Sequence, residues 1–276
     1  MLLHAPAKLN LCLYLGPRRE DGLHQLCSLF EPLALADLIE VSEGERDEVI
    51  CPGVEGENLA ARALAGLRER GWRWPPLRVE IDKRVPVAAG LGGGSGDAAA
   101  ILRLGAGEVD DLPALAAALG ADVPSQLRPA LALVRGAGER VEPLPEPAPH
   151  AAVLLPDGGG LSTAAVFAEA DRLGSGREPG ELEELAAQLR AVAGAGASPL
   201  AYPELLVNDL EAPARSLRPA IGDALDELRE AGAPVAILSG SGPTAVGLFP
   251  DLAAAHAAAA AIDRDDTIVC AAGSAP

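Results

Sequence analysis

Alternating polar and apolar positions between residues 3 and 15 mark the first predicted strand. From Lys8 onward, the polar residues Lys8 and Asn10 fall on one face and four leucines fall on the other, because successive strand side chains point to opposite sides. The leucine face is expected to enter the core. Two polar residues on the other face can simply be solvated, so this pattern alone assigns no function to them.

The rest of the first half is predicted to combine strands and helices. Leucines recur on one stripe between Asn58 and Arg70, which predicts an amphipathic helix. Asp111 is a candidate N-cap for a second helix, which Gly120 would end. Residues 35–54 are predicted to form short strands joined by acidic turns. A further strand is predicted over residues 78–83 and a hairpin over residues 130–141.

Prolines at alternate positions between residues 142 and 150 form the strongest linker signal in the chain. They predict two domains, residues 1–147 and residues 148–276. In the second domain Ser162 is a candidate helix N-cap, and one long helix is predicted from about residue 208 to residue 231, bent near its prolines. Two strands joined by Ser-Gly-Ser-Gly, an alanine-rich helix and a last strand suit a split ferredoxin-like unit.

A glycine-rich loop over residues 86–97 stands between the predicted strand at 78–83 and a helix-forming run. Glycine permits a positive φ and lets a ligand approach the backbone. Ser95 is a candidate N-cap, and the free N–H groups of the first helical turn would attract a phosphate. The sequence does not fit a Walker A loop, a dinucleotide fingerprint or a protein-kinase glycine loop. A flexible linker is the plainer alternative, but linkers rarely run directly into a capped, alanine-rich helix.

Composition narrows the function classes. The 276 residues, with 49% hydrophobic content, suit one large or two ordinary soluble domains. A net charge of −18 argues against an extended nucleic-acid or anionic-membrane surface. We expect neither a membrane span nor a signal peptide. The four cysteines lack metal or disulfide spacing, so they are expected to be free thiols in a reducing cytoplasm.

Lysine is rare in this chain, because only Lys8 and Lys83 among the 22 basic residues are lysines. Lysine and arginine are not interchangeable where a point charge must approach a phosphate or a hydroxyl. Asp122 lies in a Gly-Ala-Asp-Val-Pro stretch, where an aspartate is more often an ordinary turn residue. Beside Lys8 it would suit phosphoryl transfer to an alcohol, which needs a carboxylate near the hydroxyl and a cation nearby.

Five ordered motifs resemble those of a known family. They are Pro-Ala-Lys-Leu-Asn-Leu at 6–11 with Asp-Gly-Leu-His at 21–24, the glycine loop, Gly-Ala-Asp-Val-Pro at 120–124, Asn-Asp-Leu-Glu at 208–211 and Leu-Ser-Gly-Ser-Gly-Pro at 238–243. In this order they resemble the GHMP small-molecule kinases, and among these the members that act on a cytidine diphosphate-linked methylerythritol in non-mevalonate isoprenoid biosynthesis. The resemblance implies an α+β fold with an N-terminal ribosomal-protein-S5-like domain and a C-terminal ferredoxin-like domain.

The resemblance also implies ATP-dependent transfer of the γ-phosphoryl group to the 2-hydroxyl of this alcohol. We expect the protein to be a cytoplasmic monomer or homodimer that binds a small-molecule substrate and neither nucleic acid nor membrane. Lys8 and Asp122 match the catalytic pair of the family, in which the aspartate would take the hydroxyl proton or orient the oxygen, and the lysine would neutralise charge. The implied ATP-binding residues are Pro86, Gly90, Leu91, Gly92, Gly93, Gly94, Ser95 and Gly96, with Ser95 also a candidate Mg²⁺ ligand. The implied substrate-binding residues are Asn10, His24, Phe167, Gly240 and Ser241, although the turn at 240–242 can equally be a plain hairpin turn.

Several positions depart from the family pattern, mostly in its substrate half. Leu23 stands where an aromatic residue would stack on cytosine, and Phe167 is the candidate replacement ring. Gly96 replaces a second loop serine, Pro129 replaces a glycine, and Ser125 takes the place of a phenylalanine. Two alternatives therefore stay open. One is a kinase of this family for another small alcohol, of the homoserine or mevalonate type, and the other is a nucleotide-binding homologue without catalysis.

Overall fold

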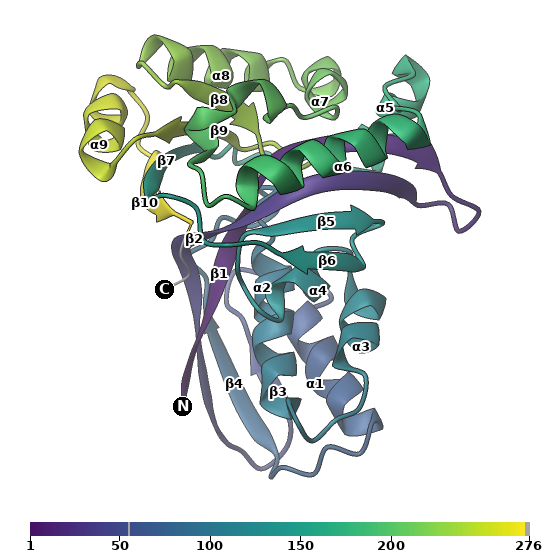
Figure 1. Ribbon diagram of the computed structural model, residues 1–276. Coiled ribbons are helices and arrows are strands. Elements are labelled where there is room, and N and C mark those ends of the chain that lie inside the picture. The colour runs from purple at the N-terminus through teal and green to yellow at the C-terminus, as the bar shows by residue number, and fades with distance from the viewer. Residues whose placement is uncertain (55, 274–276) are drawn as a thin grey trace.

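Two long strands, β1 (Leu2–Arg18) and β2 (His24–Glu43), form a hairpin that runs through both halves of the molecule (Figure 1). The computed structural model describes residues 1–54 and 56–273. The two strands pair antiparallel along nearly their whole length. The later strands join this hairpin through β2, either directly or through one or more neighbouring strands.

The hairpin is irregular at the two polar positions predicted from the sequence. Its register shifts between Pro6 and Lys8 and again between Asn10 and Cys12, and such bulges bend a strand and redirect its side chains. Residues 5–16 of β1 are buried on both faces of the strand. Lys8 and Asn10 therefore lie in the interior, and the alternative that they are solvated surface residues is wrong.

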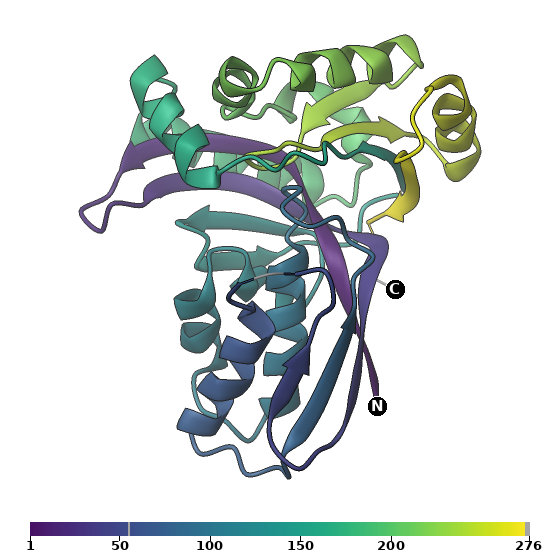
Figure 2. The same ribbon diagram turned by 180° about the vertical axis from the view of Figure 1, so that it is seen from behind.

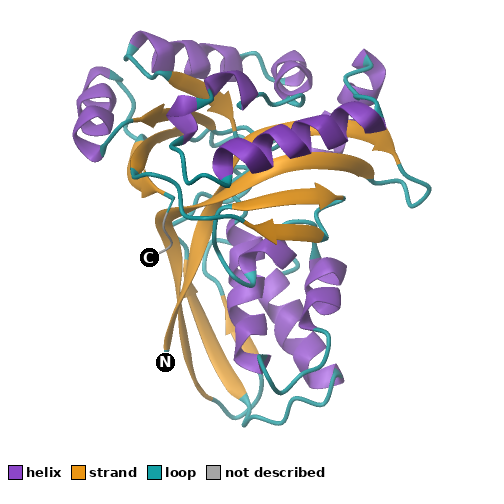
Figure 3. Ribbon diagram, in the orientation of Figure 1, coloured by secondary structure: helices purple, strands orange, loops and turns teal. Residues whose placement is uncertain are grey.

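One part of the hairpin supports a layer of helices. The strands β3 (Glu48–Ile50) and β4 (Leu77–Asp82) extend the sheet beside the end of β2, and β5 (Ala132–Gly136) and β6 (Arg140–Pro143) extend it beside the start of β2. Helices α1 (Leu59–Glu69), α2 (Gly93–Leu102), α3 (Leu112–Leu119) and α4 (Val123–Gln126) pack together beside this sheet (Figure 3). A core cluster of alanines, leucines and isoleucines fills the space between them.

The second half adds a smaller antiparallel sheet. It consists of β7 (His150–Leu155), β8 (Val235–Leu238), β9 (Ala245–Phe249) and β10 (Ile268–Ala272), and Ala272 of β10 pairs with Leu33 of β2. Helices α7 (Glu211–Leu217), α8 (Ala220–Glu230) and α9 (Leu252–Ala261) lie on its outer side (Figure 1). Helices α5 (Thr163–Leu173) and α6 (Pro179–Ala193) lie along the hairpin, with α5 near its tip (Figure 2).

The predicted α+β class is confirmed, and one core joins the two predicted domains. The largest cluster contains Leu9 and Leu29 of the hairpin together with Leu154 of β7 and Val246 of β9. The predicted boundary after residue 147 falls between β6 and β7 and stays a prediction. Within residues 1–54 and 56–273, no helix combines the length and the apolar character needed to cross a membrane.

Most predicted helix ends are confirmed, because caps depend on residues close in sequence. The side chains of Asn58, Asp111 and Ser162 each accept a hydrogen bond from a backbone N–H at the start of α1, α3 and α5. Ser95 is not an N-cap, because α2 already begins at Gly93, after Gly92 has turned the chain with a φ of 67°.

Two other predictions are wrong. The segment predicted as one bent helix over residues 208–231 forms two helices, since Pro219 disfavours helical backbone at Arg218, whose φ is −144° and ψ is 87°. Residues 35–54 are not a series of short strands, because β2 continues unbroken to Glu43 and only the three-residue strand β3 follows. The long β2 pairs with β1 and β4 over this stretch, which sequence periodicity cannot show.

Candidate active site

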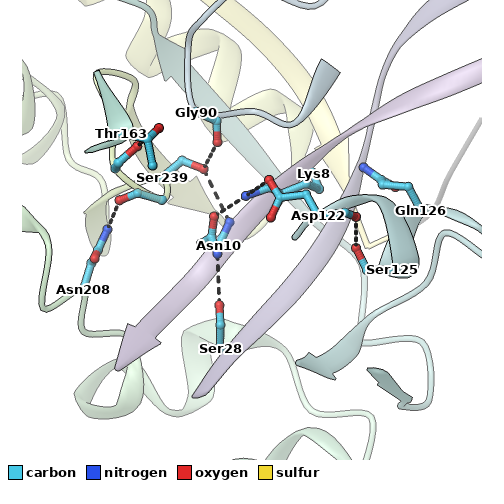
Figure 4. A network of polar contacts seen from close by, with 12 residues as sticks. Lys8, Asn10, Ser28, Gly90, Asp122, Ser125, Gln126, Thr163, Asn208 and Ser239 are labelled. Atoms are coloured by element: carbon cyan, nitrogen blue, oxygen red, sulfur yellow. Dashed lines mark hydrogen bonds and ion pairs between the residues drawn. The ribbon is translucent and has the colours of Figure 1, made fainter. Parts of the chain in front are cut away.

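Lys8 of β1 and Asp122, at the start of α4, lie side by side (Figure 4). The ammonium of Lys8 is 3.2 Å from Oδ2 of Asp122 and 2.5 Å from Oδ1 of Asn10, and it lies 4.5 Å from the centre of the Phe30 ring. Lys8 is 5% exposed, whereas the side chain of Asp122 is 31% exposed. The lysine is thus held rigidly, while the carboxylate remains open to a substrate.

The orientation of Asn10 follows from the hydrogen bonds around it. The hydroxyl of Ser28 donates its one proton to the carbonyl of Cys12, at 2.5 Å. It must therefore accept from Nδ2 of Asn10, which is 3.0 Å away. Because the amide nitrogen points to Ser28, the amide oxygen of Asn10 faces Lys8 and accepts from its ammonium. This chain of contacts stabilises the charged lysine inside the core.

Two glycine-containing segments meet above this pair. The backbone N–H of Lys8 donates to the carbonyl of Leu91 at 2.9 Å, and the hydroxyl of Ser239 donates to the carbonyl of Gly90 at 3.0 Å. The amide of Asn208 donates to the carbonyls of Leu238 and Gly240 at 2.8 and 2.7 Å. The turn between β8 and β9 is therefore fixed against the glycine-rich loop of residues 86–97, which we call the phosphate loop.

The phosphate loop borders a cavity of about 450 Å³, which we call the loop cavity. The first turn of α2 faces it without a side-chain cap, so its backbone N–H groups and the helix dipole favour an anion there. Of the implied ATP-binding residues, the cavity is lined by Pro86, Gly90, Leu91, Gly92, Gly93, Gly94 and Ser95. Gly96 does not line it, because a Cβ on Gly96 would point to the backbone of β1, 3.0 Å from the carbonyl oxygen of Pro6.

A buried cluster of charges lies under the phosphate loop. The ammonium of Lys83 contacts the carboxylates of Asp37 and Asp97, at 2.9 Å from Asp97. Asp37 also accepts the backbone N–H groups of Arg84 and Val85, whereas Oδ1 of Asp97 has no described partner. Burial raises the pKa of Asp97, although Lys83 acts against this. Burial disfavours the charged form of Lys83, but Asp97 and Asp37 outweigh it and raise the pKa of the lysine.

A second cavity of about 570 Å³ lies beside the hairpin tip, and we call it the tip cavity. It is largely apolar, and His24, Phe167 and the 55%-exposed Leu23 line it. The rings of His24 and Phe167 are 5.4 Å apart and tilted by 44°. Thr163 lines both cavities, and its hydroxyl is 2.9 Å from that of Ser241. The structure thus places the two cavities next to each other.

Comparison with known proteins identifies the family. Residues 58–127 match the family model for the GHMP kinases N terminal domain, and residues 167–266 match that for GHMP kinases C terminal. A 4-diphosphocytidyl-2-C-methyl-D-erythritol kinase of Kineococcus radiotolerans is 40% identical over 275 residues, which cover 91% of this chain and 82% of that protein. The enzyme of the same name from Paracoccus denitrificans is 42% identical over 266 residues, which cover 94% and 90%.

The chain belongs to the GHMP kinase family. Within it, the chain belongs to the 4-diphosphocytidyl-2-C-methyl-D-erythritol kinases. A crystal structure of a 4-(cytidine 5'-diphospho)-2C-methyl-D-erythritol kinase is 36% identical and has a TM-score of 0.81, with 99% of this chain and all of that chain covered. The homoserine kinase of Cytophaga hutchinsonii shares only the fold, at 17% identity and a TM-score of 0.70, with 99% and 93% covered.

Sequence reasoning missed several polar residues of this GHMP kinase site. Ser239 joins the turn between β8 and β9 to Gly90 of the phosphate loop, and Asn208 holds that turn through two of its carbonyls. Asp37 and Asp97 hold Lys83. Two of these residues could have been found from the sequence. Lys83 is one of only two lysines in the chain, and Asp97 stands at the end of the glycine-rich loop. Asp37 carried no such signal, because it belongs to a long strand whose pairing is visible only in the structure.

Proposed function

We propose that this chain transfers the γ-phosphoryl group of ATP to the 2-hydroxyl of 4-diphosphocytidyl-2-C-methyl-D-erythritol. The observation that carries the proposal is the Lys8–Asp122 pair, at 3.2 Å, beside two adjoining cavities. ATP would place its phosphates against the first turn of α2 in the loop cavity. The cytidine part of the alcohol would occupy the tip cavity, between Leu23 and Phe167.

In this arrangement Asp122 orients the hydroxyl and accepts its proton as the new O–P bond forms and ADP leaves. Lys8 offsets the negative charge that gathers on the transferred group. Phosphoryl transfer passes through a loose transition state that depends mainly on positioning and charge stabilisation. The buried ammonium of Lys8, held by Asn10 and Asp122, suits that task, since it needs no rearrangement during the reaction.

Mg²⁺ fits the donor set of the loop cavity. The hydroxyl of Ser95 and the carboxylate of Asp97 line the cavity, and Oδ1 of Asp97 is buried without a described partner. Mg²⁺ prefers oxygen ligands and usually takes only one or two from the protein, with phosphates and water completing its shell. Ser95 would be the protein residue that holds it, and the bound ion would neutralise charge on the phosphates.

The decisive experiment measures ADP release with the cytidine diphosphate-linked alcohol and, in parallel, with the same alcohol lacking cytidine. We expect turnover with the first substrate only, and Asp122→Asn should lower kcat by at least about a hundredfold. The exposed Asp110→Asn is the control and should retain full activity. Equal rates with both alcohols would instead indicate another small alcohol as the substrate. Tight ATP binding without turnover would indicate a nucleotide-binding homologue.

A further inference from the structure

Arg103 carries a partly buried charge that neither the sequence motifs nor the proposed chemistry uses. It directly follows α2, the helix that begins at the phosphate loop. Within residues 1–54 and 56–273, no ion pair joins its guanidinium to a carboxylate, and burial lowers the pKa of this group. A charge that is buried without an acidic partner costs stability, so the contacts that hold Arg103 in place are of interest.

The guanidinium donates to two backbone carbonyls on different elements. Nη1 is 2.9 Å from the carbonyl oxygen of Gln126, and Nη2 is 2.7 Å from that of His4. Gln126 is the last residue of α4, the short helix that begins after Asp122. His4 lies on β1, four residues before Lys8. One planar fork therefore joins the helix that follows Asp122 to the strand that carries Lys8.

Two further contacts hold α4 and α2 against the same part of β1. Nε2 of the buried Gln126 donates to the carbonyl oxygen of Pro6 at 3.3 Å. Gly96 of α2 faces the same carbonyl, and a Cβ on Gly96 would be 3.0 Å from its oxygen. The register of β1 shifts between Pro6 and Lys8, directly after these contacts. The place of Lys8 relative to α4 thus depends on how the two helices hold the start of β1.

We propose that Arg103 is a positioning residue that keeps Asp122 at its working distance from Lys8. Arg103 is not among the described residues that line the two cavities, so it acts through the backbone of α4 and β1. Among the described contacts, the carboxylate of Asp122 pairs with Lys8 alone, so the backbone of α4 has to aim it. The inference rests on the proposed function, because it assumes that Asp122 orients the hydroxyl.

The test is a double-mutant cycle between Arg103 and Asp122. Arg103→Met removes both donors and keeps an unbranched side chain. We expect it to lower kcat by about tenfold to a hundredfold, because a displacement of about 1 Å has an effect of this size. KM for both substrates should stay within about twofold, and a calorimetric titration with ATP should give an unchanged Kd. In an Asp122→Asn background, Arg103→Met should change the residual kcat by less than about twofold, because its effect passes through Asp122.

Arg264→Met is the matched control, because Arg264 is also a partly buried arginine and lies outside both cavities. Its guanidinium pairs with Glu227 of α8 at 2.7 Å. Arg264→Met should lower the free energy of unfolding and leave kcat unchanged. If Arg103→Met does not fold, Arg103→Lys replaces it in the cycle. An ammonium keeps the charge but lacks the planar fork, so kcat should fall by about threefold to tenfold.

The cycle separates positioning from a general loss of structure. A merely structural role would lower kcat by the same factor with and without the carboxylate of Asp122. Such equal factors, a wild-type kcat in the folded Arg103 variant, or an equal loss of kcat in Arg264→Met would overturn the inference and leave the proposed function intact. Absence of turnover by the wild type with the cytidine diphosphate-linked alcohol would overturn the proposed function and the inference with it.

Discussion

At the residue scale, the unusual feature of this enzyme is a lysine that is buried in the core and held there by its neighbours. Lys8 is 5% exposed and contacts Asn10, Asp122 and the ring of Phe30. A buried charge is tolerated only when partners and hydrogen bonds replace its water. The site accommodates the compact ammonium of a lysine. The Lys8 side chain also lies against Gly92, and a Cβ on Gly92 would be 2.7 Å from Cγ of Lys8.

We predict that Lys8→Arg lowers kcat by at least about a hundredfold, because a planar guanidinium cannot occupy the position of an ammonium point charge. KM for ATP should change far less, since the loop cavity is built mainly from the phosphate loop. Steady-state kinetics with the cytidine diphosphate-linked substrate measure both effects. Arg264→Lys, outside the two cavities, serves as the exchange control. A Lys8→Arg enzyme with near wild-type kcat would contradict the assigned role.

We predict that Leu23→Tyr lowers KM for the cytidine diphosphate-linked substrate by about tenfold, because stacking on a base contributes about 1–3 kcal/mol. Leu23 is 55% exposed and lines the tip cavity, so a larger ring can be accommodated. Neither kcat nor KM for ATP should change. An unchanged or higher KM would mean that a ring at this position does not reach the base.

At the scale of elements, the phosphate loop depends on glycine where two loops touch. Gly90 has a φ of 75°, and a Cβ there would be 2.6 Å from the carbonyl oxygen of Ser239 and 2.8 Å from that of Gly242. A side chain is excluded twice, by the positive φ and by backbone atoms that cannot move aside. The close contact lets the hydroxyl of Ser239 reach the carbonyl of Gly90.

Gly90→Ala should therefore separate the two loops. We expect a loss of about 1–3 kcal/mol in the free energy of unfolding and a rise of about tenfold or more in KM for ATP. Chemical denaturation and steady-state kinetics measure the two effects. Gly94→Ala is the control for stability, because the nearest described atom to its Cβ would be Cδ1 of Leu59 at 3.8 Å. Equal stability of the two variants would contradict the proposed contact.

At the scale of the whole molecule, a buried ion pair joins the long hairpin to the second half. Nε2 of His150 on β7 is 3.1 Å from Oε2 of Glu31 on β2, and both side chains are fully buried. Burial raises the pKa of Glu31, although His150 acts against this. Burial also disfavours the charged form of His150, but Glu31 outweighs it and raises the pKa of the histidine.

Both raised pKa values mean that the folded protein holds protons more tightly than the unfolded chain. The contribution of His150 to stability is then fully present below pH 6.5, its ordinary pKa, and is lost as the pH rises through the raised value. The contribution of Glu31 to stability changes with pH in the same direction. It begins to fall above pH 4.5, the ordinary pKa of a glutamate.

We predict that His150→Gln lowers the free energy of unfolding by about 3 kcal/mol at pH 6, since removing one partner of a buried pair leaves the other uncompensated. The difference in the free energy of unfolding between wild type and variant should become smaller toward pH 9. Denaturation at both pH values measures it, with the exposed His256→Gln as control. A difference in the free energy of unfolding that stays the same at both pH values would contradict the raised pKa values of this pair.

The features that could be predicted from the sequence are those determined by residues close together along the chain. Helix caps at Asp111 and Ser162, the strand of residues 3–15 and the helix that follows the glycine-rich loop were predictable, because hydrogen bonds and periodicity within a few residues determine them. The family resemblance correctly indicated the fold and the kinase class. The order of the motifs along the chain carried that information, and composition excluded only broad classes.

What only the tertiary structure decided is which distant groups meet. Lys8 and Asp122 become a pair because the bulged hairpin and the start of α4 are packed together, and His24 meets Asp171 because α5 lies over the hairpin tip. Gly96 turned out to face β1, which its neighbours in sequence do not reveal. Strand register and helix packing depend on contacts summed over the whole core, so local patterns can name such residues but cannot place them.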